Sequence, residues 1–333
     1  MVTISLTDPS WLRLVEAEPA ATPFHHPAWA ETLASAYGFE AEGLLVEPAE
    51  GPAVPVPVVR LRRRLSSLPF TDHCPLLGPE TSARAILAEL ERLRRAEHLG
   101  AIEIRDDAEG TGHRVESGHR HELDLGAGYE AVAAGFSKSK VSRKLRRADR
   151  EGIGVRFDTG SRALLEDFYP LHVGTRRRLG VPVQPRRFFA ELGRRVIEPG
   201  LGFTVTAEIE GDPVCSAVFL AWNGRLVYKF SASSRDRGDV GAAQAVIREA
   251  IRWGCEHGYR SLDFGRTDAG AEGLRSFKLS WGASEHDLAY TTLADRAPRT
   301  GSGRTHELLA QVLRRSPESL TRAIGTAAYR YTA

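Results

Sequence analysis

The segment that most constrains this chain runs from Leu262 to Gly282 and reads LDFGRTDAGAEGLRSFKLSWG. Leu262 and Phe264 alternate with polar residues as in a short strand, and Gly265 predicts its end, because glycine turns the chain without steric cost. A polar loop over residues 266–272 follows. The segment therefore predicts a strand, a loop and a short helix in succession.

The predicted helix has a charged residue on its apolar face. Leu274, Phe277, Lys278 and Trp281 share one face at helical spacing. An ammonium group is costly to desolvate unless an anionic or electron-rich group meets it. Two interpretations stay open: Lys278 extends past the helix end to reach water, or it serves a functional site.

Composition indicates a globular protein long enough for two domains, with 333 residues, 42% hydrophobic and 26% charged. No apolar run approaches the ~18 residues of a membrane span, and Asp8 and Glu16 stand where a signal peptide needs basic and apolar residues. We therefore expect a cytoplasmic protein. Cys74, Cys215 and Cys255 share no ligand-like spacing, so we expect core cysteines, with no disulfide framework and no metal site.

Positive charge is concentrated in the middle of the chain. Between Lys138 and Arg195 there are 16 Lys and Arg residues against 6 Asp and Glu, although the whole chain has a net charge of +2. This asymmetry predicts an anionic partner, and a solvated helix face is the alternative. The most basic stretch, SKSKVSRKLRRADREGI, has a thin apolar stripe and predicts a surface helix that joins two domains.

The two halves of the chain repeat one order of elements: a hairpin, a helix and a strand. The first copy comprises residues 44–46, 53–61, 83–98 and 102–104, and the second comprises residues 203–209, 214–221, 240–257 and 262–264. EGPAV at 50–54 matches EGDPV at 210–214, which supports an internal repeat. Pro52, Pro55 and Pro57 predict that the first hairpin contains an edge strand or an irregular strand.

These patterns predict an α+β (α/β) fold with mixed β-sheets flanked by helices. We expect an N-terminal domain over 1–135, a basic joining helix over 136–155 and a C-terminal domain over 156–290. Residues 291–333 are expected to form a linker, which includes APRTGSGRT, and tail helices over 307–313 and 320–331 that pack back on a domain.

Motifs for several other chemistries do not occur. The chain lacks a Walker lysine motif, HExxH, GxSxG and paired metal-ligand spacing, which argues against metal hydrolysis and serine hydrolysis. The stretch RDRGDVGA at 235–242 leads into the helix of the second copy and could offer backbone N–H groups to a phosphate. A plain turn capped by Asp239 is the alternative.

The tandem units, the basic joining helix, TRRRLG at 175–180 and the 262–282 segment together resemble the Fem (FemABX) family of peptidyltransferases and the related BioF2-like GNAT acyltransferases. The resemblance covers roughly residues 20–290. It implies two tandem GNAT-like acyltransferase domains without a metal. It also implies amide bond formation, in which an aminoacyl group passes from aminoacyl-tRNA to an amine of a cell-wall precursor or a small molecule.

Two other functions stay open. Some relatives use acyl-CoA, which makes an acyl-CoA-dependent GNAT N-acyltransferase the first alternative. Val240 weakens it, because the GNAT phosphate loop Q/R-x-x-G-x-G/A has Gly or Ala there. The second alternative is a non-catalytic binding module associated with RNA or polysaccharide. No cofactor besides the donor is expected, and the oligomeric state stays open.

The resemblance places Phe277 and Lys278 on the Phe-Lys pair of the family's acyl-transfer site. A pre-placed ammonium can stabilise the oxyanion that forms when an amine attacks an ester or thioester, which is typically worth roughly 10²–10³ in rate. Asp263 is the candidate base beside it, with Asp268 as a second carboxylate nearby. Either carboxylate could instead cap a helix or pair with an arginine.

Further residues are candidates for substrate and RNA contacts. Arg177 and Arg178 match the basic position of the family's T-x-x-R segment and suit a phosphate or carboxylate. The other candidate substrate contacts are Asp72, Trp29, Tyr228 and Arg266, of which Trp29 and Tyr228 fit a core position equally well. The candidate contacts to the tRNA backbone are Lys140, Arg143, Lys144 and Arg147 of the basic helix.

Overall fold

The computed structural model describes residues 1–47, 52–236, 238–298 and 310–331. Contacts within the chain define two compact units, the first formed by 1–119 and 287–301 and the second by 120–286 and 302–332. Strands β6 (His113–Asp124) and β12 (Ser284–Ala294) each begin in one unit and end in the other. The domain boundaries expected at 135 and 290 differ from this division and stay a prediction.

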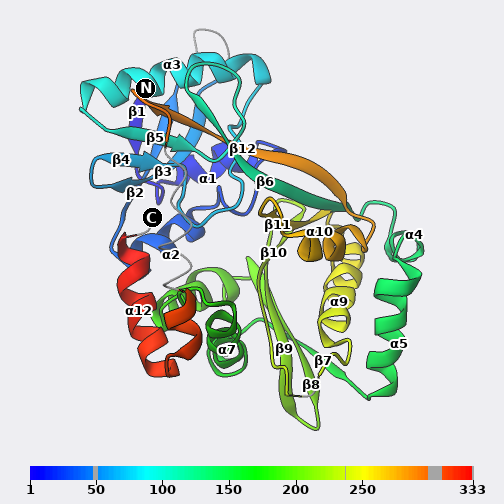
Figure 1. The fold of residues 1–333 in the computed structure, drawn as a ribbon. Helices are drawn as coiled ribbons and strands as arrows, with labels where there is room; N and C mark the ends of the chain where they lie inside the picture. The colour runs from blue at the N-terminus through cyan, green and yellow to red at the C-terminus, as the bar shows by residue number, and fades with distance from the viewer. Residues whose placement is uncertain (48–51, 237, 299–309, 332–333) are drawn as a thin grey trace. The chain divides into compact units, whose positions relative to one another are not determined.

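The first unit combines a mixed sheet with helices (Figure 1). Its elements are β1 (Val2–Ile4), α1 (Pro9–Glu16), α2 (Pro27–Tyr37), β2 (Glu40–Val46), β3 (Val54–Leu61), β4 (Arg64–Ser66), η1 (Glu80–Ser82), α3 (Ala83–Ala96) and β5 (Ala101–Ile104). The strand order is β1-β2-β3-β4-β5-β12. Helix α3 connects β4 to β5, and this strand pair is parallel.

The proline-rich strand was predicted to be an edge strand or an irregular strand, and the edge position is not observed for β3 as a whole. Strand β3 lies inside the sheet, between β2 and β4. Its pairing with β4 covers only Val59–Leu61, whereas Pro55 and Pro57 lie in the part that pairs with β2 alone. The prolines therefore avoid the ladder positions at which β4 would need their missing N–H groups. Glu50 and Gly51 of the predicted hairpin turn lie outside the described residues.

The second unit has more helices around its sheet. Its helical segments are α4 (Tyr129–Ala134), η2 (Lys138–Ser142), α5 (Arg143–Arg150), α6 (Ser161–Ala163), η3 (Leu164–Phe168), α7 (Tyr169–Leu179), α8 (Arg186–Leu192), η4 (Gly193–Ile197), α9 (Ala242–Glu256), α10 (Glu272–Leu279), residues 310–315 and α12 (Glu318–Tyr331). Its strands are β7 (Gly154–Asp158), β8 (Gly202–Ile209), β9 (Asp212–Trp222), β10 (Arg225–Ser233) and β11 (Ser261–Thr267). They follow the order β6-β11-β10-β9-β8-β7.

The predicted internal repeat is present in the structure. Strands β2 and β3 form an antiparallel hairpin that is followed by β4, α3 and β5, and β8 and β9 form a hairpin that is followed by β10, α9 and β11. In both copies the helix connects two parallel strands. The fold is the expected mixed α/β arrangement. Part of the predicted linker and residues 307–309 of the first tail helix lie outside the described residues.

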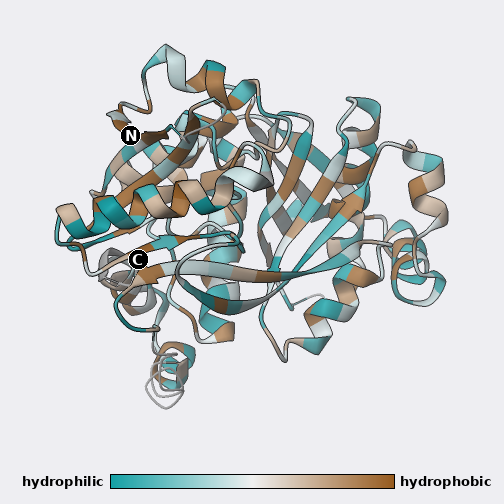
Figure 2. Ribbon diagram, turned by 90° about the horizontal axis from the view of Figure 1, so that it is seen from above, coloured by the Kyte–Doolittle hydropathy of each residue, from teal (hydrophilic) through white to brown (hydrophobic). Residues whose placement is uncertain are grey.

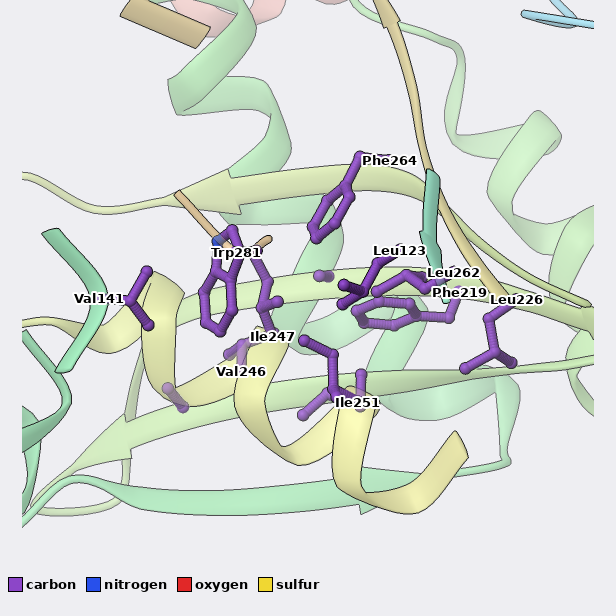
Figure 3. Packing of buried hydrophobic residues seen from close by; sticks show 14 of the residues in the cluster. Leu123, Val141, Phe219, Leu226, Val246, Ile247, Ile251, Leu262, Phe264 and Trp281 are labelled. Atoms are coloured by element: carbon purple, nitrogen blue, oxygen red, sulfur yellow. The ribbon is translucent and has the colours of Figure 1, made fainter. Parts of the chain in front are cut away.

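A hydrophobic core lies between α9 and the sheet of the second unit (Figure 3). Val246, Ile247 and Ile251 of α9 are at most 1% exposed. They pack in one cluster with Phe264 of β11 and with Trp281, which follows α10. Figure 2 shows hydrophobic and hydrophilic residues together on the same strands and helices, as expected for elements with one buried face. This core fixes both ends of the 262–282 segment.

Candidate functional site

Lys278 is buried, with 3% of its surface exposed. Its Nζ donates hydrogen bonds to the carbonyl oxygens of Gly265 (2.8 Å) and Arg266 (2.9 Å). The strand β11 does not end at Gly265 as predicted but continues to Thr267, so these carbonyls lie in its last residues. The ammonium is therefore held at the C-terminal end of β11 by backbone acceptors and does not extend to water.

The predicted apolar face of α10 is only partly correct. Trp281 is fully buried, and Phe277 packs against the core and contacts the Trp281 ring at 6.4 Å between centroids. Leu274, in contrast, is 43% exposed. Helix α10 has 8 residues. Its first turn, which contains Leu274, is exposed to solvent, and its last turn contains the buried Lys278. The Phe-Lys pair thus joins the core to the end of β11.

Asp263 lies two residues before the carbonyls that hold Lys278. Its Oδ1 accepts a hydrogen bond from the Gly265 N–H at 2.7 Å, and its Oδ2 lies 3.8 Å from Nη1 of Arg120. Arg120 also donates to Glu122 at 2.6 Å. The carboxylate of Asp263 therefore belongs to a network of charged groups on β6 and β11. It is linked to Lys278 through Gly265, whose N–H it accepts and whose carbonyl oxygen holds the ammonium.

A second charged network supports the same strand end. His121 is fully buried, and its Nε2 lies 3.0 Å from Oε2 of Glu285, while its Nδ1 lies 3.4 Å from Oγ1 of Thr267. Arg275 of α10 makes two hydrogen bonds to Glu285, at 2.6 and 2.7 Å, and this carboxylate raises the pKa of Arg275. These contacts join β6, β11, α10 and β12 around the Lys278 position.

Arg266, a candidate substrate contact, pairs with the exposed carboxylate of Asp268. This ion pair spans two residues at the end of β11 and orders the start of the loop that leads to α10. Tyr228 of β10 packs partly buried against the core of the second unit, and burial raises the pKa of its hydroxyl. For Tyr228 the structure favours the core interpretation that its sequence position left open.

The candidate RNA-binding residues of the basic helix have different surroundings. Lys140 donates to Oγ of Ser276 on α10, and Lys144 forms an ion pair with Asp239. The Nε of Arg147 lies 3.4 Å from Oε1 of Glu151, and the Arg147 side chain is 45% exposed. Arg143 is exposed. The two lysines therefore connect the basic helix to α10 and to the start of α9, and the two arginines face solvent.

Two adjoining cavities lie where β10 ends and α9 begins. The smaller cavity, about 400 Å³, is lined by the connecting loop, including Gly238, Asp239 and Gly241. The larger cavity, about 620 Å³, is lined by α7, by the end of β10 and by Arg314 of the helical segment 310–315. The lining of both includes residues 233–235. We call the larger one the arginine cavity.

Arg177 and Arg178 both line the arginine cavity. Arg178 donates to Oγ1 of Thr175 and to the carbonyl oxygen of Ser233, at 3.3 and 3.2 Å. The Ser233 N–H in turn donates to Oγ1 of Thr175 at 3.1 Å, so the threonine of the TRRRLG motif ties α7 to the end of β10. Partial burial and the nearby Arg235 guanidinium lower the pKa of Arg178.

Two candidate substrate contacts belong to the first unit. Trp29 is 1% exposed, and its indole N–H donates to Oγ1 of Thr71 at 2.8 Å, which places it in the core. Asp72 is half-buried, and its carbonyl oxygen accepts a hydrogen bond from the Tyr290 hydroxyl at 2.6 Å. The structure thus places these two residues in a unit different from that of Lys278.

The cysteines behave as core residues. Cys74 and Cys215 are buried, and burial raises the pKa of Cys215 to about 12, so its thiol stays protonated at neutral pH. In the described ranges, no three His, Cys, Asp or Glu side chains gather as metal ligands. No helix within those ranges has the length and apolar character required to cross a bilayer.

Sequence reasoning missed two residues of the arginine cavity, Arg235 and Arg314. Arg235 opens the stretch that we considered as a phosphate loop, so its position gave a weak signal. Arg314 gave none, because it lies more than 130 residues from Arg178 and only tertiary packing brings it to the cavity.

Comparisons with known proteins agree with this geometry. Residues 136–286 match the family model described as an acetyltransferase (GNAT) domain, whereas no curated protein matches the chain. Among solved structures, FemX has a TM-score of 0.67 at 14% identity, covering 93% of this chain and 100% of that one. L-PGS from Bacillus licheniformis has a TM-score of 0.55 at 15% identity, covering 96% and 98%. A tandem GNAT protein from the clavulanic acid biosynthesis pathway has a TM-score of 0.50 at 13% identity, covering 90% and 99%.

Residues 136–286 form an acetyltransferase (GNAT) domain, and this segment contains Lys278 and the loop that lines both cavities. The fold of the whole chain is similar to that of FemX, as the resemblance seen in its sequence predicts.

Proposed function

We propose that this acyltransferase forms an amide bond by transferring an aminoacyl group from aminoacyl-tRNA to an amine of a cell-wall precursor or a small molecule. The observation that carries the proposal is Lys278, a buried ammonium held at the end of β11 inside the GNAT domain. A buried cation with a fixed position suits a reaction in which negative charge develops on an oxygen.

Lys278 would stabilise the tetrahedral intermediate. When the amine attacks the ester carbonyl of the donor, a C–N bond forms and the carbonyl oxygen becomes an oxyanion. The ammonium is already desolvated and held by the carbonyls of Gly265 and Arg266, so stabilising the oxyanion needs little reorganisation. Collapse of the intermediate then breaks the C–O bond to the tRNA ribose. Phe277 beside it would help to exclude water from the acyl group.

Asp263 is the proposed base that accepts the proton lost by the attacking amine. Its carboxylate lies on β11 two residues before Gly265, accepts a hydrogen bond from the Gly265 N–H and lies 3.8 Å from Nη1 of Arg120. The proton leaves the amine as the C–N bond forms, and the ribose hydroxyl takes up a proton as the leaving group. Arg266, whose Asp268 pair orders the loop, would contact the substrate next to this step.

Donor binding would use the exposed arginines of the basic helix and the arginine cavity. Arg143 and Arg147 face solvent and can neutralise RNA phosphates. Lys140 and Lys144, in contrast, would act by fixing the basic helix against Ser276 and Asp239. The resemblance of the sequence to the Fem family supports a donor and an acceptor of this kind, and the chain is similar in fold to FemX.

The second candidate is an acyl-CoA-dependent N-acyltransferase. The cavity of about 400 Å³ at the start of α9 favours it, because a glycine-containing loop before a helix suits a pyrophosphate. The carboxylate of Asp239 lines the same cavity and opposes an anion there, although Lys144 pairs with it.

The test is donor binding combined with single-turnover transfer to an amine. The purified protein is titrated with a pool of charged tRNA and, separately, with acetyl-CoA, each at two salt concentrations. We expect tRNA binding that weakens steeply with salt and falls when Arg143 and Arg147 are changed to Glu. Arg187→Glu, an exposed arginine on α8, is the matched control. Tight acetyl-CoA binding without tRNA binding would assign the second candidate.

Lys278 variants test the chemistry separately from binding. Lys278→Met should lower the rate of transfer from the bound donor by roughly 10²–10³ while the donor still binds. Lys278→Arg keeps a cation and should retain part of the rate. A Lys278→Met variant that folds, binds donor and transfers at the normal rate would assign stabilisation of the oxyanion to another group. An unmodified chain that binds donor and transfers nothing would leave the non-catalytic binding module.

A further inference from the structure

The arginine cavity has walls from three separate parts of the second unit. Helix α7 supplies Arg177 and Arg178, the segment after β10 supplies Arg235 and Asp236, and the helical segment 310–315 supplies Arg314. Among the described lining residues, four guanidinium groups therefore face one carboxylate. The Asp236 carboxylate accepts a hydrogen bond from the Ser234 hydroxyl at 2.6 Å, so one of its oxygens already has a local donor.

This accumulation of positive charge is unfavourable without an anion. Both Arg178 and Arg235 line the cavity, and partial burial together with the Arg235 guanidinium lowers the pKa of Arg178. Arg178 is held in place by Thr175 and the Ser233 carbonyl, so it cannot simply turn away from Arg235. An excess of guanidinium groups around one cavity is typical of sites for phosphate groups, which they bind with paired hydrogen bonds.

The C-terminal tail is closely fitted to the helix that carries two of these arginines. Gly180, which ends α7 with φ +72°, leaves room for the tail, since a Cβ there would lie 2.8 Å from the Ala310 carbonyl oxygen. A Cβ at Gly325 would overlap the backbone of Val183. Leu313 is fully buried, and Arg176 donates to the Tyr329 hydroxyl at 2.8 Å. The tail thus places Arg314 at the cavity through a packed interface.

We infer that the C-terminal tail is a working part of an anion site, in which Arg314 joins Arg177, Arg178 and Arg235 around a phosphate group of the acyl donor. The inference rests on the proposed function only in assigning the phosphate to the donor. Both tRNA and coenzyme A carry such groups, and the cavity recognises the chemistry that they share.

Calorimetric titration with inorganic pyrophosphate tests the site directly. The full chain should bind pyrophosphate, and binding should weaken at higher salt. Arg314→Ala should weaken it about tenfold, as expected for the loss of a charge-assisted contact. Arg315→Ala is the matched control, because Arg315 is the exposed neighbour on the same segment and does not line the cavity. It should change binding less than about twofold.

Three results would overturn the inference: no pyrophosphate binding by the unmodified chain, unchanged binding by Arg314→Ala, or equal losses in the Arg314 and Arg315 variants. Arg314→Gln, which keeps a polar N–H donor without the charge, guards against a loss caused by detachment of the tail. It should weaken binding as Arg314→Ala does, and normal binding by this variant would contradict the role of the guanidinium charge.

Competition then identifies the source of the phosphate. Displacement of pyrophosphate by coenzyme A or by an RNA oligonucleotide with the tRNA 3′ end supports the donor assignment and says which donor is used. Displacement by neither would overturn that assignment. Lys278→Met should bind pyrophosphate normally, so failed acyl transfer with intact anion binding contradicts the proposed chemistry and leaves the anion site standing.

Discussion

The two copies of the repeated unit differ most in the connection between the first strand of the parallel pair and the helix that follows it. In the first copy, 16 residues separate β4 from α3, at 67–82, and several of them are buried: Ser67, Leu68, Thr71, Cys74 and Leu77. In the second copy, 8 residues separate β10 from α9, at 234–241. The described residues of this shorter loop that face solvent are Arg235, Asp236, Gly238 and Asp239.

This difference shows how the same connection can add to the core in one copy and line cavities in the other. The long connection of the first copy brings its own apolar side chains to the start of α3 and adds them to the core. The short connection of the second copy has few apolar side chains, and it lines both cavities next to α9. The fold is shared between the copies, and the candidate site depends on the loop, as is common for duplicated folds.

The largest expected effect comes from a glycine in the second connection. Gly241 has φ +84°, and a Cβ there would overlap the Lys144 carbonyl oxygen on α5, which is backbone and cannot move aside. Gly78 in the first connection has a similar φ of +86°, but its Cβ would meet only the Val54 side chain at 3.1 Å. Gly241→Ala should therefore lower the free energy of unfolding by about 3 kcal/mol, and Gly78→Ala by about 1 kcal/mol.

Chemical denaturation of both variants measures this difference, and hydrogen exchange locates it. Gly241→Ala should increase exchange in α5 and α9, and Gly78→Ala should leave those helices unchanged. Equal losses at the two positions would mean that the left-handed backbone alone sets the cost. The contrast between the two connections would then not include the close packing of α5.

Much of the fold could be predicted from the sequence because the strands and helices carry local patterns. The hairpins, α3, α9 and the repeat follow from periodicity and glycine positions. The interior position of β3 and the extension of β11 to Thr267 could not be predicted, since both depend on pairing with distant strands. The passage of β6 and β12 between the two units also depends on contacts far apart in sequence.

The candidate site was predictable only where a residue conflicts with its local pattern. Lys278 stands out because a cation lies on an apolar helix face, and the structure buries it. Lys140 and Lys144 look like solvent-facing charges in sequence, but Ser276 and Asp239 meet them from other elements. Arg314 has no local signal, because only the packing of the tail on α7 gives it a role.

As pH falls, the stability contributed by the first connection should be lost at a higher pH than that contributed by the second. Burial lowers the pKa of His25 to about 4, and the buried ring accepts a hydrogen bond from the Thr22 N–H and lies 3.0 Å from the Pro75 carbonyl oxygen of the first connection. The histidine of the unfolded chain has a pKa of about 6.5, so it binds a proton at a higher pH than the buried His25 does. The free energy of unfolding should therefore fall by about 2 kcal/mol between pH 6.5 and 5.

Denaturation at several pH values compares the unmodified chain with His25→Gln. The variant is expected to lose about 2 kcal/mol less stability over that interval, whatever its stability at pH 7. His172 of the second unit, whose pKa burial lowers to about 3, contributes a similar dependence that His25→Gln leaves in place. Parallel curves for the two proteins would show that the connection does not hold His25 neutral.

The smallest effect concerns the ion pair that holds the second connection to the basic helix. Lys144 lowers the pKa of Asp239, so the pair stabilises the fold above the unfolded pKa of about 4 and loses this contribution as pH falls through the lower folded value. The two side chains are 22% and 67% exposed, so solvent screens the interaction. A double-mutant cycle with Lys144→Met and Asp239→Asn should therefore give a coupling energy below about 1 kcal/mol at pH 7, and less at high salt. A coupling energy several times larger would mean that this pair, more than the packing at Gly241, fixes the connection against α5.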